Sequence, residues 1–528
     1  MRTLFIGMDG ATFSILDALT VAINGQKPVM PFLAHIYRAG ARSILRSTPN
    51  PLTPPAWVSL MTGKNPGKHG VFDFIRAEDR GHDVFFTLYD SRDCLAESIW
   101  SIASRQGKRV GVLNFPFTAP PLGNLNGFMV PGFVPWRHLR RNTIPGDLLD
   151  LLKTLPGFNL KELAWDFDLE KQAVDNLSDE DRERWVRYHL PRENQWFRIA
   201  RYLLFEKDPD LMAIMFDGVD KLQHQAWAFI EPHAQDGAEG AYHQRMHGLC
   251  MDYFRHLDGF LECLVKQAGP DAQVFLASDH GFTTTTEVVR INTYLQQKGH
   301  LQWKQMPDTA EAARREDSMF VNLDWENTTA YCPTGSSNGI VIRIGDRPGR
   351  PGIKPEDYEP FRDRLIGELR DLCDAETGEP VIIGIFKREE VFSGPAMSRA
   401  PDLLLVLRDS GFVSIKNKAP VVERRQHVAG THHPDGVFFA FGPGIRQGEE
   451  TESHNIADVG ATLLYSLGLE VPVDFDGRVA EGVFTRQHLQ QNPIVMGSAT
   501  MGPNRDQEAE YITDEEKIKA QLRILGYL

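Results

Sequence analysis

Short apolar runs that stop at a polar residue or a glycine recur along this chain of 528 residues. They read TLFIGMDG, RVGVLNFP, DLMAIMFDG, AQVFLASDHG, PDLLLVL and GVFFAFGPG. Strands covered by helices on both faces lose the polar alternation of an exposed strand and show this pattern. Amphipathic stretches such as RHLDGFLECLVKQAG lie between several of the runs. The alternation predicts an α/β fold built on a doubly wound, mostly parallel sheet.

Acidic residues and histidines follow three of these runs directly. Asp9 ends the first run, a segment from Asp217 to Asp220 follows DLMAIMF, and Asp279 and His280 follow AQVFLAS. Ligands in doubly wound sheets bind beyond the carboxyl ends of the strands. We therefore expect these three distant segments to meet on one edge of the sheet.

Two stretches interrupt this rhythm and predict cap-like insertions. Residues 76–200 contain a Pro-rich piece and the charged helical stretch LSDEDRERWVRYHL, and are expected to supply both core strands and part of a cap. Residues 286–399 carry turns, a Gly-rich section and a charged helix, and predict a second cap that shapes a substrate pocket. The catalytic core is then expected in residues 1–75, 201–285 and 400–490.

The last part of the chain, residues 491–528, predicts a polar linker followed by a short helix. Thr513 and Glu516 have the spacing of a capping box, and apolar residues recur on one face after them. We expect this helix to dock on the core.

Composition limits the classes of partner. A formal net charge of −14 argues against nucleic acid or an anionic membrane as the main partner, although a local basic funnel is compatible with it. No apolar stretch reaches the roughly 18 residues of a membrane span. The chain begins directly with a strand-like run, and its five widely spaced cysteines predict free, buried thiols. These features predict a cytoplasmic protein without a membrane span.

The candidate metal ligands combine carboxylates and imidazoles. Asp220 and His224 are four residues apart, so on a helix both project from one face and can share a metal. Asp217 is an alternative ligand, but its position favours a helix cap. Asp279 and His280 can approach one ion from adjacent positions because Gly281 permits a tight turn.

Two further candidates are ambiguous by themselves. Asp9, followed by a glycine, can bind a metal or cap a turn. His432 is expected in a loop before the run GVFFAFGPG, beside His433 as an alternative.

A single alcohol, Thr53, has the setting of a nucleophile. It precedes two prolines and the expected helix WVSLMTG, which ends in a glycine cap. Such a hydroxyl can cap the helix, and it can also attack a phosphate that faces the helix N–H groups. Metal coordination would lower its pKa enough for attack at neutral pH. The competing hydroxyls are Ser47, Thr48, Ser59 and Thr62.

The ordered set of these segments resembles the alkaline phosphatase superfamily. The resemblance is to its type I phosphodiesterase/nucleotide pyrophosphatase branch and to predicted phosphohydrolases and phosphomutases. The matching segments are GMDGA, LTPPAWVSLMTGKNPGKHGVFDF, DKLQH, SDHGF, RAPDLLL, GTHHPDGVFFAFGPGI and NIADVGATLLYSLGLEVPVDFDGR. The resemblance implies an alkaline phosphatase-like core and a small-molecule phosphate ester as substrate.

The resemblance also implies a binuclear metal site, usually zinc, with manganese as the alternative. One metal would be held by Asp220, His224 and His432. The other would be held by Asp9, Asp279, His280 and the Thr53 oxygen. Thr53 would attack phosphorus in line, and water would hydrolyse the resulting phosphothreonine. His69, in the segment PGKHG, matches a family position that we interpret as support for the nucleophile loop.

Two departures from the family pattern narrow the activity. Nucleotide pyrophosphatases typically carry an asparagine shortly after the HG pair, whereas this chain has Phe74 at about that place. LTPPAW also lacks the modifiable cysteine or serine of sulfatases. We expect a metal-dependent phosphohydrolase or phosphodiesterase. The alternatives are a phosphomutase or phosphotransferase of the same superfamily and a metal-stabilised binding protein.

Overall fold

A nine-stranded sheet forms the centre of the computed structural model, which describes residues 3–22, 25–123, 125–164, 177–232, 240–304 and 323–502. In spatial order its strands are β17 (Glu449–Glu450), β2 (Ala41–Arg46), β16 (Asp435–Phe441), β8 (Gln273–Ala277), β1 (Thr3–Met8), β7 (Leu211–Phe216), β5 (Val110–Leu113) and β6 (Gly127–Val130), with β18 (His454–Asn455) pairing β2. The strands from β8 to β6 are all parallel, and β16 is antiparallel to both of its neighbours. The predicted mostly parallel α/β sheet is confirmed.

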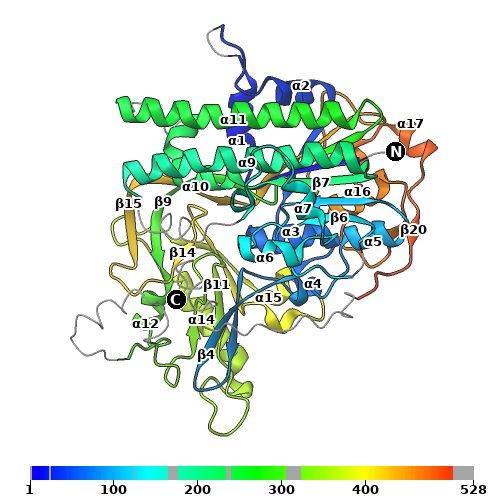
Figure 1. The fold of residues 1–528 in the computed structure, drawn as a ribbon. Coiled ribbons are helices and arrows are strands. Elements are labelled where there is room, and N and C mark those ends of the chain that lie inside the picture. The colour runs from blue at the N-terminus through cyan, green and yellow to red at the C-terminus, as the bar shows by residue number, and fades with distance from the viewer. Residues whose placement is uncertain are drawn as a thin grey trace.

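Helices cover both faces of this sheet (Figure 1). The first face packs against α9 (Asp179–Lys207), α10 (Gly218–Ile230) and α11 (Ala241–Ala268), and the second packs against α3 (Thr53–Thr62), α5 (Ile99–Arg105) and α16 (Ile456–Ser466). Strand β1 shows why its sequence is apolar throughout. Leu4 and Ile6 enter the core of the first face, whereas Phe5 enters the core of the second. Because side chains alternate along a strand, covering both faces requires a continuous apolar run.

A separate four-stranded sheet forms the cap, seen at the bottom of Figure 1. Its order is β10 (Ala330–Tyr331), β11 (Gly339–Ile342), β13 (Leu403–Leu407) and β12 (Ile382–Lys387), and helix α14 (Tyr358–Arg370) packs against it. A hairpin of β3 (Ile75–Asp79) and β4 (Val84–Leu88) completes the apolar core of the cap.

The sequence predicts that the catalytic core resumes at residue 400, and this boundary is wrong. The run PDLLLVL forms β13, which pairs antiparallel with β11 and β12 in the cap sheet. A short run that is buried on both faces has the same composition in either sheet, so the sequence alone does not assign it.

A three-stranded ribbon joins the core to the cap. It consists of β14 (Val413–Ser414), β9 (Gly281–Arg290) and β15 (Val422–His433). Strand β9 begins immediately after Asp279 and His280, and β15 ends at His433. Their antiparallel register pairs His432 with Phe282. The ribbon therefore brings His432 back to the carboxyl end of β8.

Three further expectations concern the cysteines, membrane-spanning helices and the C-terminal helix. All five cysteines are free. Three are buried, Cys263 is only partly buried and Cys373 is exposed, so the prediction of buried thiols is wrong for Cys373 and only partly met by Cys263. Across the described ranges we find no helix with both the length and the apolarity that a bilayer crossing requires. The predicted C-terminal helix around Thr513 and Glu516 lies outside the described residues.

Candidate metal centre

Parallel strand ends place the candidate ligands on one edge of the central sheet. In the registers of β1 with β7 and β8, Met8 pairs with Phe216 and Gly7 pairs with Ala277. Asp9 therefore emerges beside the start of α10 and beside the segment that follows β8. Its amide N–H donates to the Phe216 carbonyl over 3.0 Å.

Asp220, His224 and His432 form a first group. The Asp220 Oδ1 atom lies 3.3 Å from His224 Nε2 and 3.2 Å from His432 Nε2. The two Nε2 atoms are 3.0 Å apart. Asp220 and His224 share one face of α10, as their spacing predicts. His432 lies one residue before the end of β15 and not in a loop, because the polar stretch VERRQHVAGTHH pairs with β9.

Asp9, Asp279, His280 and Thr53 form a second group. The His280 Nε2 atom lies 3.2 Å from Asp279 Oδ2, 3.7 Å from Asp9 Oδ1 and 3.4 Å from Thr53 Oγ1. All four side chains are buried. The nucleophile candidate and two candidate carboxylate ligands thus surround the Nε2 atom of His280.

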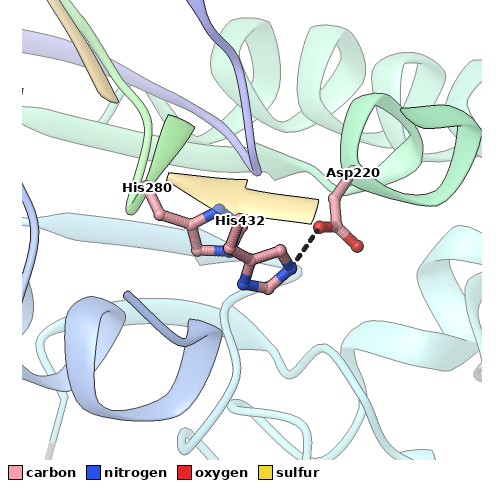
Figure 2. A group of neighbouring side chains, drawn as sticks. All are labelled: Asp220, His280 and His432. Carbon is pink, nitrogen blue, oxygen red and sulfur yellow. Dashed lines mark ion pairs between the residues drawn. The ribbon is translucent and has the colours of Figure 1, made fainter. Parts of the chain in front are cut away.

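The two groups adjoin through His280 and His432. Figure 2 shows these two histidines with Asp220, and their rings stack with centroids 3.6 Å apart. Potential ligand atoms of Asp220, His280 and His432 lie within 4.8 Å of one another, as do those of Asp9, Asp279 and His280. All seven residues predicted for the site therefore converge on one place.

The hydrogen bonds of the two histidines leave their Nε2 atoms available as ligands. His432 Nδ1 lies 2.8 Å from the Pro51 carbonyl, and His280 Nδ1 lies 3.1 Å from the Gly281 carbonyl. A carbonyl only accepts, so each Nδ1 carries the hydrogen and each Nε2 carries the lone pair. Such backbone contacts fix the tautomer and orientation of a metal-binding histidine.

The carboxylate oxygens also fit cation binding. Asp9 Oδ1, Asp220 Oδ1 and Asp279 Oδ2 are buried and accept no hydrogen bond from the described residues. A buried carboxylate oxygen without a donor is costly unless it is protonated or binds a cation. Three such atoms facing imidazole nitrogens form a donor set of the N/O type that zinc or manganese accepts.

The pKa values of the three carboxylates shift in different directions. Burial and the neighbouring Asp279 and Asp220 carboxylates raise the pKa of Asp9 well above its ordinary value. Burial raises the pKa of Asp279 to about 8. Burial would also raise the pKa of Asp220, but the imidazoles of His224 and His432 hold it well below its ordinary value. The second group therefore holds protons at pH 7 that a bound divalent cation would displace.

Thr53 occupies the first turn of α3 without capping it. Leu52 is the N-cap residue, and the Thr53 hydroxyl makes no capping hydrogen bond. Pro54 and Pro55 have no N–H, and the Ala56 N–H donates to Leu52 O over 3.1 Å. Of the helix N–H groups expected to face the attacked phosphate, the first three residues of α3 thus offer only that of Thr53, because proline removes the other two. Cations would have to supply most of the charge stabilisation.

Three supports of the site lie outside the predicted set. Trp57 Nε1 donates to Asp9 Oδ2 over 3.4 Å, the Gly10 amide donates to Asp279 Oδ1 over 3.1 Å, and Gln223 Nε2 donates to the Gly10 carbonyl over 2.7 Å. Trp57 stands one helical turn after Thr53, which is the signal in the sequence that could have identified it.

The alternative residues have other roles. Asp217 pairs with Arg192 and accepts a 3.1 Å hydrogen bond from Asn114, so it neither caps α10 through its side chain nor belongs to either candidate group. His433 Nδ1 accepts from the Asp435 amide. His69 is fully buried and contacts the Ser59 hydroxyl on α3 over 2.9 Å. Phe74 packs against the apolar core of the cap.

Comparisons with known proteins agree with this geometry. The family model for type I phosphodiesterase / nucleotide pyrophosphatase matches residues 3–435. None of the curated proteins matches the chain by sequence.

Solved structures show the same fold. Murine ectonucleotide pyrophosphatase/phosphodiesterase 5 is 16% identical, with a TM-score of 0.52 over 93% of this chain and 100% of that chain. The human protein is 15% identical, with a TM-score of 0.53 over 93% and 99%. An inactive threonine-to-alanine variant of the murine protein, in complex with AMP, is 15% identical with a TM-score of 0.51 over 93% and 99%.

Proposed function

Because the chain belongs to the type I phosphodiesterase / nucleotide pyrophosphatase family of phosphoric ester hydrolases, we propose that it cleaves phosphate esters through a covalent phosphothreonine on Thr53. The observation that carries this proposal is the set of three unpartnered carboxylate oxygens that face histidine Nε2 atoms beside the Thr53 hydroxyl. This arrangement combines a nucleophile with ligands for two cations.

The residues fit two divalent cations, with zinc as the proposed metal and manganese as the alternative. Asp220, His224 and His432 would hold one ion, and Asp9, Asp279, His280 and the Thr53 oxygen would hold the other. When bound, such cations lower the pKa of a coordinated hydroxyl and stabilise negative charge on phosphoryl oxygens.

Thr53 performs the covalent step. Its Oγ1 attacks phosphorus opposite the departing oxygen, the phosphorus–oxygen bond to that group breaks, and a phosphothreonine forms. Water then attacks the same phosphorus and restores the threonine. Thr53 is buried in the first turn of α3, where the helix backbone and the two following prolines restrict its movement. This placement fixes the direction in which Oγ1 attacks. The inactive threonine-to-alanine variant of the murine relative supports the choice of a threonine.

The preferred ester class is proposed to be a diester. The family description names phosphodiesterases, and the candidate site is lined by the acidic side chains of Asp9, Asp220 and Asp279. A monoester carries more negative charge on its non-bridging oxygens than a diester, so it benefits more from additional cationic side chains.

A paired hydrolysis assay tests the proposal. Purified protein would be assayed with bis-p-nitrophenyl phosphate and p-nitrophenyl phosphate, and its metals measured by inductively coupled plasma spectrometry. Diester cleavage that Thr53→Ala abolishes supports the proposal. Thr62→Ala is the matched control, because that hydroxyl lies in the same helix and donates to the Val58 carbonyl. Substantial turnover by Thr53→Ala would place the nucleophile elsewhere, and transfer to an added alcohol in place of water would indicate a phosphotransferase.

A further inference from the structure

Four aromatic rings lie around His432. The ring of His224, with its centroid 4.9 Å away, belongs to the first group of candidate ligands and is partly exposed. The other three belong to His280, Phe282 and Phe412, with centroids 3.6, 5.2 and 4.8 Å from that of His432. His280 and Phe282 are buried, at 0% and 3% exposure. Phe412 is only partly buried. Its ring meets His432 at an interplanar angle of 73° and so stands edge-to-face against a candidate ligand.

Phe412 comes from the cap and is held there by Asn338. The Asn338 side chain donates to the Gly411 carbonyl over 3.1 Å and accepts from the Val413 amide over 2.9 Å. The two hydrogen bonds thus bracket Phe412 on both sides. Asn338 has a φ of 46°, a left-handed conformation that asparagine tolerates better than most residues. Its carbonyl accepts from Leu405 in β13, which ties this bracket to the cap sheet.

The same cap segment contacts the loop that carries the nucleophile. Asn50 Nδ2 donates to the Ser336 carbonyl over 3.3 Å, and Thr334 donates to the buried Asp73 carboxylate. Ser336 is two residues before Asn338, and Asn50 is three residues before Thr53. These hydrogen bonds link the segment that holds Phe412 to the loop that leads to Thr53.

Phe412 packs against His432, which belongs to the first group and not to the group that contains Thr53. In an in-line displacement at two metals, one ion faces the attacking oxygen and the other faces the departing oxygen. The first group is therefore the one that faces the departing group.

We infer that Phe412 is a specificity-determining residue that contacts the departing group and favours esters in which this group is aromatic. The inference rests on the proposed function, because it assigns one side of the same site. Aromatic rings gain from offset or edge-to-face contact beyond the area they bury. Asn338 is a positioning residue that acts through Phe412.

Binding of two stable diesters tests the inference without requiring turnover. Diphenyl phosphate and diethyl phosphate carry the same charge and differ in their aromatic groups. Their dissociation constants would be measured by calorimetry on metal-loaded Thr53→Ala protein. Adding Phe412→Ala is expected to weaken diphenyl phosphate by about 3- to 10-fold, the range of an aromatic pair, and diethyl phosphate by less than about 2-fold. Phe412→Tyr should retain the preference.

Two further variants make the test specific. Phe386→Ala is the matched control, because this phenylalanine lies in β12 of the cap sheet and is 41% exposed. It should leave both constants unchanged. Asn338→Gly keeps the left-handed backbone conformation but removes both bracketing hydrogen bonds, so it should lower the aromatic preference with a smaller effect than Phe412→Ala.

Failure of this inference can be distinguished from failure of the proposed function. If Phe412→Ala keeps the ratio of the two constants, or if the starting protein shows no aromatic preference, the inference is wrong and the proposed function is unaffected. The proposed function is instead judged by hydrolysis of bis-p-nitrophenyl phosphate by the wild-type protein. An unchanged ratio in Asn338→Gly would contradict the positioning role of Asn338.

Discussion

His280 and His432 stack with ring planes inclined by only 20°, although His280 immediately precedes β9 and His432 lies in β15. Two imidazolium ions could not share this buried position, because like charges repel strongly where water is excluded. Burial lowers the pKa of His280 well below its ordinary value and also lowers that of His432. Both rings are therefore neutral at pH 7, which is the form that binds metals.

A first prediction tests the two ligand sets by removing one ligand from each group. His432→Ala removes a ligand from the first group, and Asp279→Asn removes a charged ligand from the second. We expect each variant to lose about one of two bound metals per chain, as measured by plasma spectrometry after gel filtration. His433→Ala is the control, because His433 is the adjacent residue and contacts the Asp435 amide instead. If both His432→Ala and Asp279→Asn keep two metals, the proposed ligand sets are wrong.

A second prediction concerns the indole that orients Asp9. The Trp57 N–H donates to Asp9 Oδ2 and leaves Asp9 Oδ1 directed at the site. Gly7 makes room for this ring, since a Cβ there would lie 2.6 Å from the Trp57 Cη2 atom. Trp57→Phe should keep the fold but weaken metal binding by roughly 10- to 100-fold, as expected when a supporting hydrogen bond to a ligand is lost.

Competition with a chromogenic chelator would measure this change. Trp100→Phe is a matched control, because Trp100 packs on the same Phe115 ring and its Nε1 has no hydrogen-bond partner among the described residues. Equal metal affinities for Trp57→Phe and the wild type would exclude an orienting role for the indole.

A third prediction follows from the tautomer of His69. The Val71 amide donates to His69 Nδ1 over 3.2 Å, so Nε2 carries the hydrogen and donates to Ser59. Protonating Nδ1 would break the first bond, and burial lowers the pKa of His69 to about 3. The folded-state pKa lies below the unfolded value of about 6.5. The stabilising contribution is therefore complete above pH 6.5 and is lost progressively as the pH falls towards 3.

Urea unfolding of chelator-treated protein at pH 7 and pH 5 would measure this effect. We expect His69 to account for about 2 kcal/mol of the stability lost between these values. His69→Gln preserves a polar side chain without a titrating group, so it should show a correspondingly smaller loss. A similar loss in both proteins would mean that the charged form of His69 is accommodated in the fold.

The sequence was sufficient for the parts of the site that depend on local order. Asp9, Asp279 and His280 end apolar runs, and parallel strands place such ends together whatever lies between them. The pair of Asp220 and His224 depends only on helical spacing. The family resemblance then added His432 and Thr53, whose own surroundings in the sequence were ambiguous.

The remaining parts depend on long-range pairing. His432 reaches the site through the register of β15 with β9, and the exposed, charged sequence of β15 has no apolar alternation to reveal a strand. Strand β13 belongs to the cap because β12 pairs with it, which its own composition does not encode. The two hydrogen bonds from Asn338 to the neighbours of Phe412 form because two loops, distant in the sequence, meet in the folded cap.

A fourth prediction links metal binding to proton release. Without metal, the pKa of Asp279 is about 8 and that of Asp9 is raised, so at pH 7 the folded protein holds protons on this pair. A metal requires the ionised carboxylates, whereas His280 and His432 are already neutral and release none. Calorimetric titration with zinc in two buffers of different ionisation enthalpy should show release of about one proton or more at pH 7. The number should fall as the pH rises through 8, where the carboxyl loses its proton before metal is added. His433→Ala should behave as the wild type does, and metal binding at pH 7 without proton release would show that Asp9 and Asp279 are not ligands.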